Sequence, residues 1–295
     1  MCCFAVTAID RQHAACCCKA LLWNLLPHLR NVAGLQRTAV AVIGQEITHL
    51  QGWRCMQHLI GAPAGFNYTE DKSEARTNVQ SQGDRLFYVQ QGHKAMRNAL
   101  RMLEDSEGWR VEIAESNGDV ICSKVMPDAR KVFRLEAVLD GSVDELYDLL
   151  FVRVEEMNLW NPSIQQIKIL KQVGPETMVT HEVSAETAGN LIGQRDFLSV
   201  RHSCKQESRV YLGGVAIQLE SFPPQAGFVR AEDGPTCIII QALDKDTRKS
   251  RFTWLLNMDV KGWLPTSIVN QALPRAQLDF TRHLRRRLAV SATLG

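Results

Sequence analysis

The sequence has no excess of charge of either sign and no apolar run long enough to cross a bilayer. Its 34 basic and 32 acidic residues give a formal net charge of +2, so no global field favours a nucleic acid or an acidic partner. The apolar stretch from Ala39 to Gly44 is soon followed by Glu46 and His49, whereas a spanning helix needs about 20 apolar residues. We therefore expect a protein that binds no nucleic acid and does not span a membrane.

Paired cysteine motifs are also missing. The nine cysteines are odd in number, and no C-x-x-C pair occurs among them. A disulfide framework and a zinc site are therefore not expected, and we predict no metal and no cofactor. Cys122, Cys204 and Cys237 lie in strand-like segments and are predicted to be reduced, buried side chains, which suits an intracellular compartment.

The first 60 residues have the composition of a leader. Within residues 1–45, basic side chains are frequent and Asp10 is the single acid. Five leucines would share one face of a helix: Leu21, Leu22, Leu25, Leu26 and Leu29. A basic, acid-poor, amphipathic segment is typical of a mitochondrial presequence. A poorly ordered tail would have a similar spacing, so the pattern alone leaves both interpretations open.

A polar segment over residues 61–83 separates this leader from the rest of the chain. It is rich in Gly, Pro, Ser, Asn and Gln without periodicity, which is typical of a flexible linker. Apolar residues then recur at near-helical spacing from Leu86 to Leu103 and predict a first helix that breaks around Glu107 and Gly108. We therefore place the folded domain over residues 84–295.

Short alternating segments dominate this domain and predict nine strands. A helical segment over Val143–Val154, stopped by Trp160-Asn161-Pro162, interrupts them. The strand candidates are Val111–Ala114, Val120–Val125, Val132–Val138, Gln165–Val173, Met178–Ala185, Asp196–His202, Ser208–Leu219, Phe228–Ala242 and Ser250–Val260.

The last predicted element is a helix from about Thr266 to Ala289. Its apolar residues are spaced three or four apart: Val269, Leu273, Ala276, Phe280, Leu284 and Leu288. At 1.5 Å per residue the helix would be roughly 35 Å long, enough to lie across a whole sheet. We therefore expect an α+β fold in which an antiparallel sheet curves around this helix. Pro274 removes one helical hydrogen bond and is expected to kink the axis.

Several short segments of this sequence resemble those of a known protein family. They are Lys131-Val132-Phe133-Arg134-Leu135-Glu136, Trp160-Asn161-Pro162, Ala188-Gly189-Asn190-Leu191 through Arg195-Asp196-Phe197, Arg230-Ala231-Glu232, Asp233-Gly234-Pro235-Thr236-Cys237 and Lys261-Gly262-Trp263-Leu264-Pro265. In order, from about residue 84 to the end, they closely resemble the START domain of steroidogenic lipid-transfer proteins.

The resemblance implies a helix-grip fold, in which a U-shaped, nine-stranded antiparallel sheet wraps a long carboxy-terminal helix and encloses a hydrophobic tunnel. It also implies cholesterol as cargo and delivery to mitochondria in support of steroid hormone synthesis, with a cytosolic pool before import. The protein would then be a monomeric carrier and not an enzyme, and it would meet the mitochondrial outer membrane surface. The basic run on the last helix suits such a surface: Arg275, Arg282, His283, Arg285, Arg286 and Arg287.

Strand parity singles out Glu182 and Arg201 as candidate ligand-binding residues. Either can face a tunnel, where an isolated charge is so unfavourable that the two must pair. From residue types alone a solvent-exposed cross-strand pair is the commoner arrangement. In the family the matching residues face the tunnel and are associated with the sterol hydroxyl, so we expect this role here. His181 lies on the opposite face from Glu182 and is not expected to join it.

Further candidate site residues lie in a turn, on the last helix and in a loop. Asn161 is either a turn residue at a helix end or a polar group of the site. Three apolar residues of the last helix are expected to be both core and tunnel wall: Phe280, Leu284 and Leu288. Gly189 and Asn190 lie in an expected lid loop, and Arg195 is expected to hold that loop in place.

Two other functions remain open from the residues. A helix-grip domain can be an enzyme, such as a polyketide cyclase, but that requires tunnel-facing acid, base or nucleophile groups beyond a neutralised ion pair. A carrier of a phospholipid or an oxysterol is the second alternative.

Overall fold

The computed structural model describes residues 72–186, 193–243 and 246–294, all of which belong to one compact unit. The predicted leader over residues 1–60 lies outside the described residues. The expected linker over 61–83 is described only from Lys72, where a helix already begins. The first helix therefore starts twelve residues before Asp84, the predicted start of the domain.

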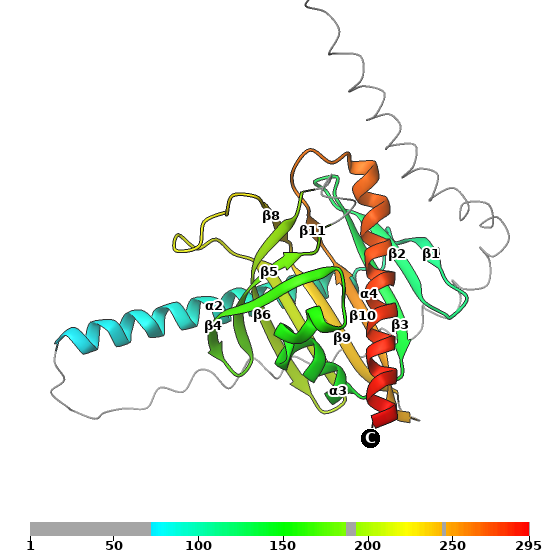
Figure 1. Cartoon of the computed structure of the whole chain (residues 1–295), viewed down its shortest axis with the longest axis horizontal. Coiled ribbons are helices and arrows are strands. Elements are labelled where there is room, and N and C mark those ends of the chain that lie inside the picture. The colour runs from blue at the N-terminus through cyan, green and yellow to red at the C-terminus, as the bar shows by residue number, and fades with distance from the viewer. Residues whose placement is uncertain (1–71, 187–192, 244–245, 295) are drawn as a thin grey trace, which may run out of the picture. The chain divides into compact units, whose positions relative to one another are not determined.

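A single curved sheet forms the body of the domain (Figure 1). Nine of its strands follow the order β1-β2-β3-β10-β9-β7-β6-β5-β4, and every neighbouring pair on this path is antiparallel. The strands of this path are β1 (Arg110–Ala114), β2 (Val120–Val125), β3 (Lys131–Leu139), β4 (Ile164–Gly174), β5 (Thr177–Ser184), β6 (Arg195–Gln206), β7 (Arg209–Ala216), β9 (Thr236–Leu243) and β10 (Asp246–Leu256).

Two short strands lie off this path and correct the sequence prediction. The candidate Phe228–Ala242 is in fact β8 (Val229–Asp233) and β9, and the candidate Ser250–Val260 is β10 and β11 (Met258–Asp259). Both breaks have one cause, because Gly234 packs against Asn257 and donates its backbone N–H to the Asn257 carbonyl at 2.8 Å. Pro235 cannot donate a ladder bond at this point. β8 then runs parallel to β6 while β11 pairs with β8.

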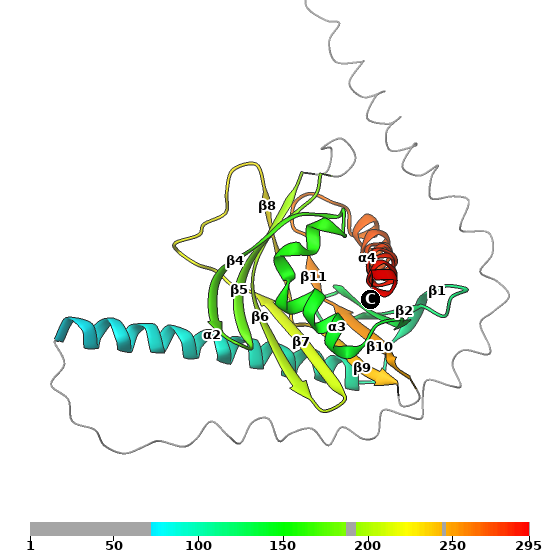
Figure 2. The same cartoon turned by 60° about the horizontal axis from the view of Figure 1, so that its bottom comes forward.

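Helices cover both faces of the sheet. Helix α2 (Lys72–Glu104) crosses the convex face, while α4 (Thr266–Leu294) and the segment after β3 lie on the concave side (Figures 1 and 2). This segment is α3 (Val143–Tyr147), a π turn over Asp148–Val152 and a 3-10 turn over Val154–Leu159. The predicted helix from Val143 is thus present, although it changes pitch twice before Trp160.

Local chemistry fixes where these helices begin and how closely they pack. The Ser142 hydroxyl accepts a hydrogen bond from the Glu145 backbone N–H at 3.1 Å, so it caps the start of α3. On the convex face, Gly92 lets α2 approach β6, because a Cβ there would lie 2.5 Å from Cβ of His202. Substitution of Gly92 would therefore push α2 away from the sheet.

The main core fills the concavity between the sheet and α4. Leu135, Ile240 and Phe252 from the sheet are fully buried there together with Leu146 and Leu284. Full burial of such a side chain contributes about 1.5–3 kcal/mol, so this core holds α4 onto the sheet. The predicted apolar stripe of α4 is only partly right, since Ala276 is exposed while the polar Gln277 and Thr281 are fully buried.

Candidate functional site

Glu182 and Arg201 meet on the concave side of the sheet. They project from neighbouring strands β5 and β6, and in the ladder Arg201 lies opposite Met178, a residue of the main core. The Arg201 guanidinium donates from Nη2 to Oε2 of Glu182 at 2.8 Å and from Nε to the hydroxyl of Thr180 at 3.0 Å. The structure therefore forms the pair that strand parity predicted.

The environment of this pair is interior. Burial raises the pKa of the Glu182 carboxyl, and Arg201 opposes that shift without cancelling it. Yet 23% of the Glu182 side chain and 25% of the Arg201 side chain remain accessible. Both side chains are therefore mostly but not fully buried on the concave side of the sheet. The pair is thus more enclosed than the solvent-exposed cross-strand pair that residue types alone favour.

A second carboxyl, which the sequence argument did not select, lies beside the pair. Asp233 at the end of β8 accepts a hydrogen bond from the Ser199 hydroxyl at 3.0 Å. Burial raises its pKa also, while Arg201 and the Ser199 bond act in the opposite direction. Asp233 in turn helps to raise the pKa of Glu182. The polar end of the concave face thus contains two carboxyls and one guanidinium.

Aromatic rings form an apolar wall on the same side of the sheet. The Phe280 ring of α4 lies 5.5 Å from the Trp160 ring and 5.0 Å from the Trp254 ring of β10. All three side chains pack against the main core and yet stay partly exposed. Incompletely buried rings beneath a covering helix provide the kind of apolar surface that a lipid ring system can contact.

The other two helix candidates behave differently from Phe280. Leu284 has no exposed area and Leu288 is 3% exposed, and Leu288 packs so closely on Gly141 that a Cβ there would lie 2.8 Å from a Leu288 methyl group. Both are filled core positions that hold α4. Of the three predicted wall residues, Phe280 is thus the one with surface left to offer a ligand.

Asn161 and Arg195 each stabilise the local structure through hydrogen bonds to the backbone. The Asn161 side-chain oxygen accepts the Ser163 backbone N–H at 3.1 Å, which is the turn arrangement expected before Pro162. The buried Arg195 guanidinium donates to the carbonyls of Gly193, Val260 and Lys261, and burial lowers its pKa. It therefore ties the start of β6 to the chain that leads into α4. The predicted lid residues Gly189 and Asn190 lie outside the described residues.

A separate charged cluster occupies the convex face. The fully buried Asp196 accepts hydrogen bonds from His181 at 3.0 Å and Arg230 at 2.8 Å. Burial alone would raise its pKa, but these two bonds outweigh burial and lower it. His181 is thus on the other side of the sheet from Glu182, as strand alternation predicts, and this cluster supports the loop before β8.

Only some of the basic side chains of α4 are available to contact a membrane surface, because others pair with acidic residues of the protein. Arg285 turns inward and donates two hydrogen bonds of 2.6 Å to Asp119, a residue that is 2% exposed. Arg282 pairs with Asp279 at 2.7 Å on the surface, whereas Arg286 is exposed. The run therefore combines a tertiary anchor with surface charges.

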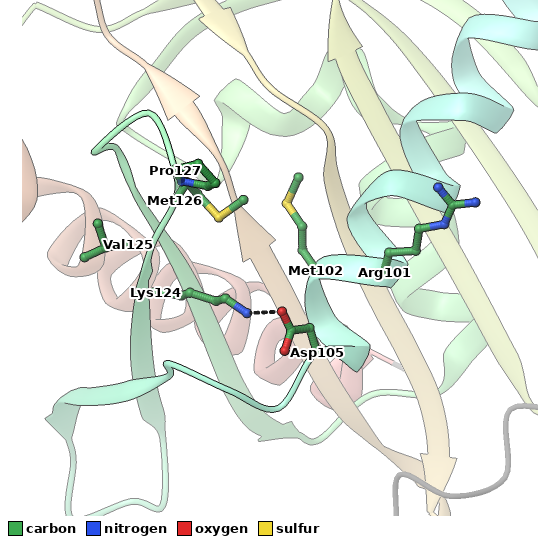
Figure 3. Close-up of a pocket in the computed structure, with 7 residues that line it drawn as sticks. All are labelled: Arg101, Met102, Asp105, Lys124, Val125, Met126 and Pro127. Atoms are coloured by element: carbon green, nitrogen blue, oxygen red, sulfur yellow. Dashed lines mark hydrogen bonds and ion pairs between the residues drawn. The ribbon is translucent and has the colours of Figure 1, made fainter.

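The structure also has a surface pocket of about 490 Å³ at the end of α2, and neither Glu182 nor Arg201 lines it (Figure 3). Met102 and Met126 supply apolar lining, while Lys124 bridges to Asp105 at 2.5 Å.

Within the described ranges, no group of three His, Cys, Asp or Glu residues could hold a metal ion. None of the described helices has the length and apolar character needed to cross a bilayer.

Comparison with known sequences gives extensive matches. The steroidogenic acute regulatory protein, mitochondrial, of Danio rerio is 42% identical over 267 residues, which cover 89% of this chain and 91% of the relative. The protein of the same name from Ovis aries is 44% identical over 269 residues, covering 88% of this chain and 91% of the relative.

Solved structures agree on the fold. Human StAR-related lipid transfer protein 5 superposes with a TM-score of 0.64 at 19% identity, covering 70% of this chain and 99% of the other. Human STARD10 gives a TM-score of 0.55 at 17% identity, with coverages of 63% and 78%. The model of the START domain family matches residues 90–292. The chain therefore belongs to the START domain family.

Proposed function

We propose that this chain is a monomeric carrier that binds one cholesterol molecule and delivers it to mitochondria, where it supports steroid hormone synthesis. The likeness to proteins named mitochondrial steroidogenic acute regulatory protein, over about nine-tenths of each chain, supports this function. So does the leader-like composition of residues 1–60. The protein acts from a cytosolic pool before import.

The ion pair of Glu182 and Arg201 is the observation that carries this proposal. A sterol is apolar except for its 3-hydroxyl, which donates one hydrogen bond and accepts others. The Glu182 carboxylate accepts a hydrogen bond from the sterol hydroxyl, while Arg201 donates one to the hydroxyl oxygen, directly or through water. The rings then lie against Phe280 and its two tryptophan neighbours. One chain supplies every part of this site, so a monomer suffices.

Other ligands fit the charges less well. A phospholipid headgroup carries a permanent phosphate charge, whereas Arg201 is already bound to Glu182 at 2.8 Å. An oxysterol would need an additional polar partner near the apolar wall. For an enzyme, the ion pair offers neither a free base nor a nucleophile, because each charge neutralises the other. A cholesterol carrier needs no catalytic group, no metal and no cofactor.

Identification of the bound lipid tests the function directly. The full chain is purified from a sterol-containing host, its lipid is extracted with solvent, and the loaded protein is assayed for sterol transfer between liposomes. We expect cholesterol in the extract at up to one molecule per chain, together with transfer above the protein-free rate. Recovery of phospholipid without sterol would overturn the proposal.

The delivery step requires a membrane-facing surface, and we propose that the loop before α4 provides it. Trp263 is 79% exposed and Ile268 is 48% exposed, so two large apolar side chains point outward near the start of this helix. Tryptophan is well suited to the membrane interface. The outer surface of mitochondria is the proposed target.

We expect Trp263→Ala to weaken binding to anionic vesicles about tenfold, because burial of a large apolar side chain contributes about 1.5–3 kcal/mol. Vesicle co-sedimentation measures this partition. Val125→Ala, at a 61% exposed apolar position on β2, is the matched control and should bind like the wild type. Equal losses in both variants would remove Trp263 from the proposed membrane surface.

A further inference from the structure

Asp233 shares one level of the sheet with two hydroxyl side chains of the candidate site. Thr180 on β5 lies opposite Ser199 on β6, and the parallel pairing of Phe197 with Ala231 brings β8 alongside β6. Two residues further along both strands, the Ser199 hydroxyl donates to Oδ2 of Asp233 at 3.0 Å. Thr180 in turn accepts from Arg201. The carboxyl of Asp233 therefore belongs to the same polar row as the ion pair.

The charges in this row do not balance if both carboxyls are ionised. Arg201 is a single cation, and its Nη2 is bound to Glu182 at 2.8 Å. The nearby Lys261 is occupied elsewhere, by Glu232 at 3.1 Å and by Asp259 at 2.9 Å. Opposite Asp233 in the β11 ladder is Met258, which has no charge. Within the described part of the chain, Asp233 therefore has no cation at bonding distance.

Asp233 is partly buried, and a carboxylate without a cation partner is unfavourable in such a place, so we infer that one of the two acids retains its proton. Because Glu182 has the guanidinium as its partner, the proton belongs on Asp233. Burial raises the pKa of the Asp233 carboxyl, which agrees with this assignment. Oδ2 is engaged by Ser199, and among the described residues no hydrogen bond to Oδ1 is present, so a proton on Oδ1 is available to a ligand.

We propose that Asp233, as a neutral acid, donates a hydrogen bond to the oxygen at the polar end of the ligand, so that the site accepts 3-oxo sterols as well as 3-hydroxy sterols. The inference rests on the proposed function, because it places a sterol oxygen beside Glu182 and Arg201. A ketone can only accept hydrogen bonds, and an ion pair flanked by a second carboxylate would repel it. A protonated Asp233 removes that repulsion and supplies a donor.

Equilibrium binding of radiolabelled cholesterol and cholest-4-en-3-one to the delipidated full chain tests this role. We expect the wild type to bind both ligands. Asp233→Ala should lose affinity for the ketone by about five- to tenfold and lose less for cholesterol, which can still donate to Glu182. Asp233→Asn should retain the ketone, because its amide also donates. Glu232→Ala, on the adjacent surface position, should match the wild type for both ligands.

The pH dependence separates this role from a purely structural one. As pH rises, ionisation of Asp233 removes the donor, so ketone affinity of the wild type should fall while that of Asp233→Asn stays level. Cholesterol binding without ketone binding, or ketone binding unaffected in Asp233→Ala, would overturn the inference and leave the proposed function standing. A wild type that binds neither ligand would instead contradict the proposed function.

Discussion

Replacing Arg201 with leucine is expected to lower the affinity for cholesterol by about 10- to 100-fold, since hydrogen bonds to charged groups contribute about 1.5–3 kcal/mol. The variant removes the donor to the sterol oxygen and leaves the Glu182 carboxyl without the guanidinium that pairs with it. Equilibrium binding of radiolabelled cholesterol to the purified full chain measures the effect. Circular dichroism must first show that the variant is folded.

The control for this prediction removes both members of the pair. Breaking a buried pair by removing one partner costs about 3–5 kcal/mol, whereas replacing both partners by apolar residues is often neutral. The side chains here are about a quarter exposed, so the loss in Arg201→Leu should fall at or below the low end. Glu182→Met combined with Arg201→Leu should therefore recover stability without recovering binding. Sterol affinity that returns together with stability would show that the pair has only a structural role.

Alternation of apolar residues was enough to predict the main sheet from sequence. The nine strands on the main path correspond to the nine candidates, and the segment from Val143 and the helix from Thr266 are both present. The two additional strands were not predicted because each candidate segment was taken as one continuous strand through Gly234 or Asn257. Their mutual contact breaks both strands, and it joins residues that are 23 positions apart. Pro235 was the local signal that one of these strands could not continue.

The missed parts of the candidate site depend on contacts that no local pattern encodes. Asp233 reads as a turn residue before Gly234-Pro235, and its neighbour Ser199 is 34 positions away. Gln277 and Thr281 are polar and do not belong to the apolar stripe expected for α4, yet both are fully buried. The Gln277 amide donates to the Trp254 carbonyl at 3.1 Å, and the Thr281 hydroxyl donates to carbonyls of its own helix. The burial of such polar side chains can be recognised only when the tertiary hydrogen-bond partner is known.

The first helix begins earlier than the sequence composition predicts. Residues 72–83 have a polar composition that favours a linker, and the structure nevertheless continues α2 back to Lys72. Propensity is a weak guide here, because polar residues, and even Gly83, can extend a helix that packing has already started. The packing in question lies further along, where Ala95, Met96, Ala99 and Leu103 are buried against the sheet.

The second large effect is expected at Arg285, which fixes the carboxy-terminal half of α4. Arg285→Leu leaves the buried Asp119 carboxyl without its two 2.6 Å hydrogen bonds from the guanidinium. Loss of one partner of a buried pair costs about 3–5 kcal/mol, and we expect the lower end, because 27% of the Arg285 side chain is exposed. Urea unfolding of the full chain measures the change in the free energy of unfolding.

Arg286→Leu is the matched control, because it removes an exposed arginine from the next position of the same helix and should change stability by less than about 0.5 kcal/mol. Hydrogen exchange should locate the effect: in Arg285→Leu, amides around Leu284 and Leu288 should exchange faster, since these core residues are held where Arg285 anchors the helix. The first turns of α4, before Pro274, are already largely exposed and should change little. Equal stability losses in the two variants would show that Asp119 does not anchor α4, and that the core leucines alone hold this helix across the candidate site.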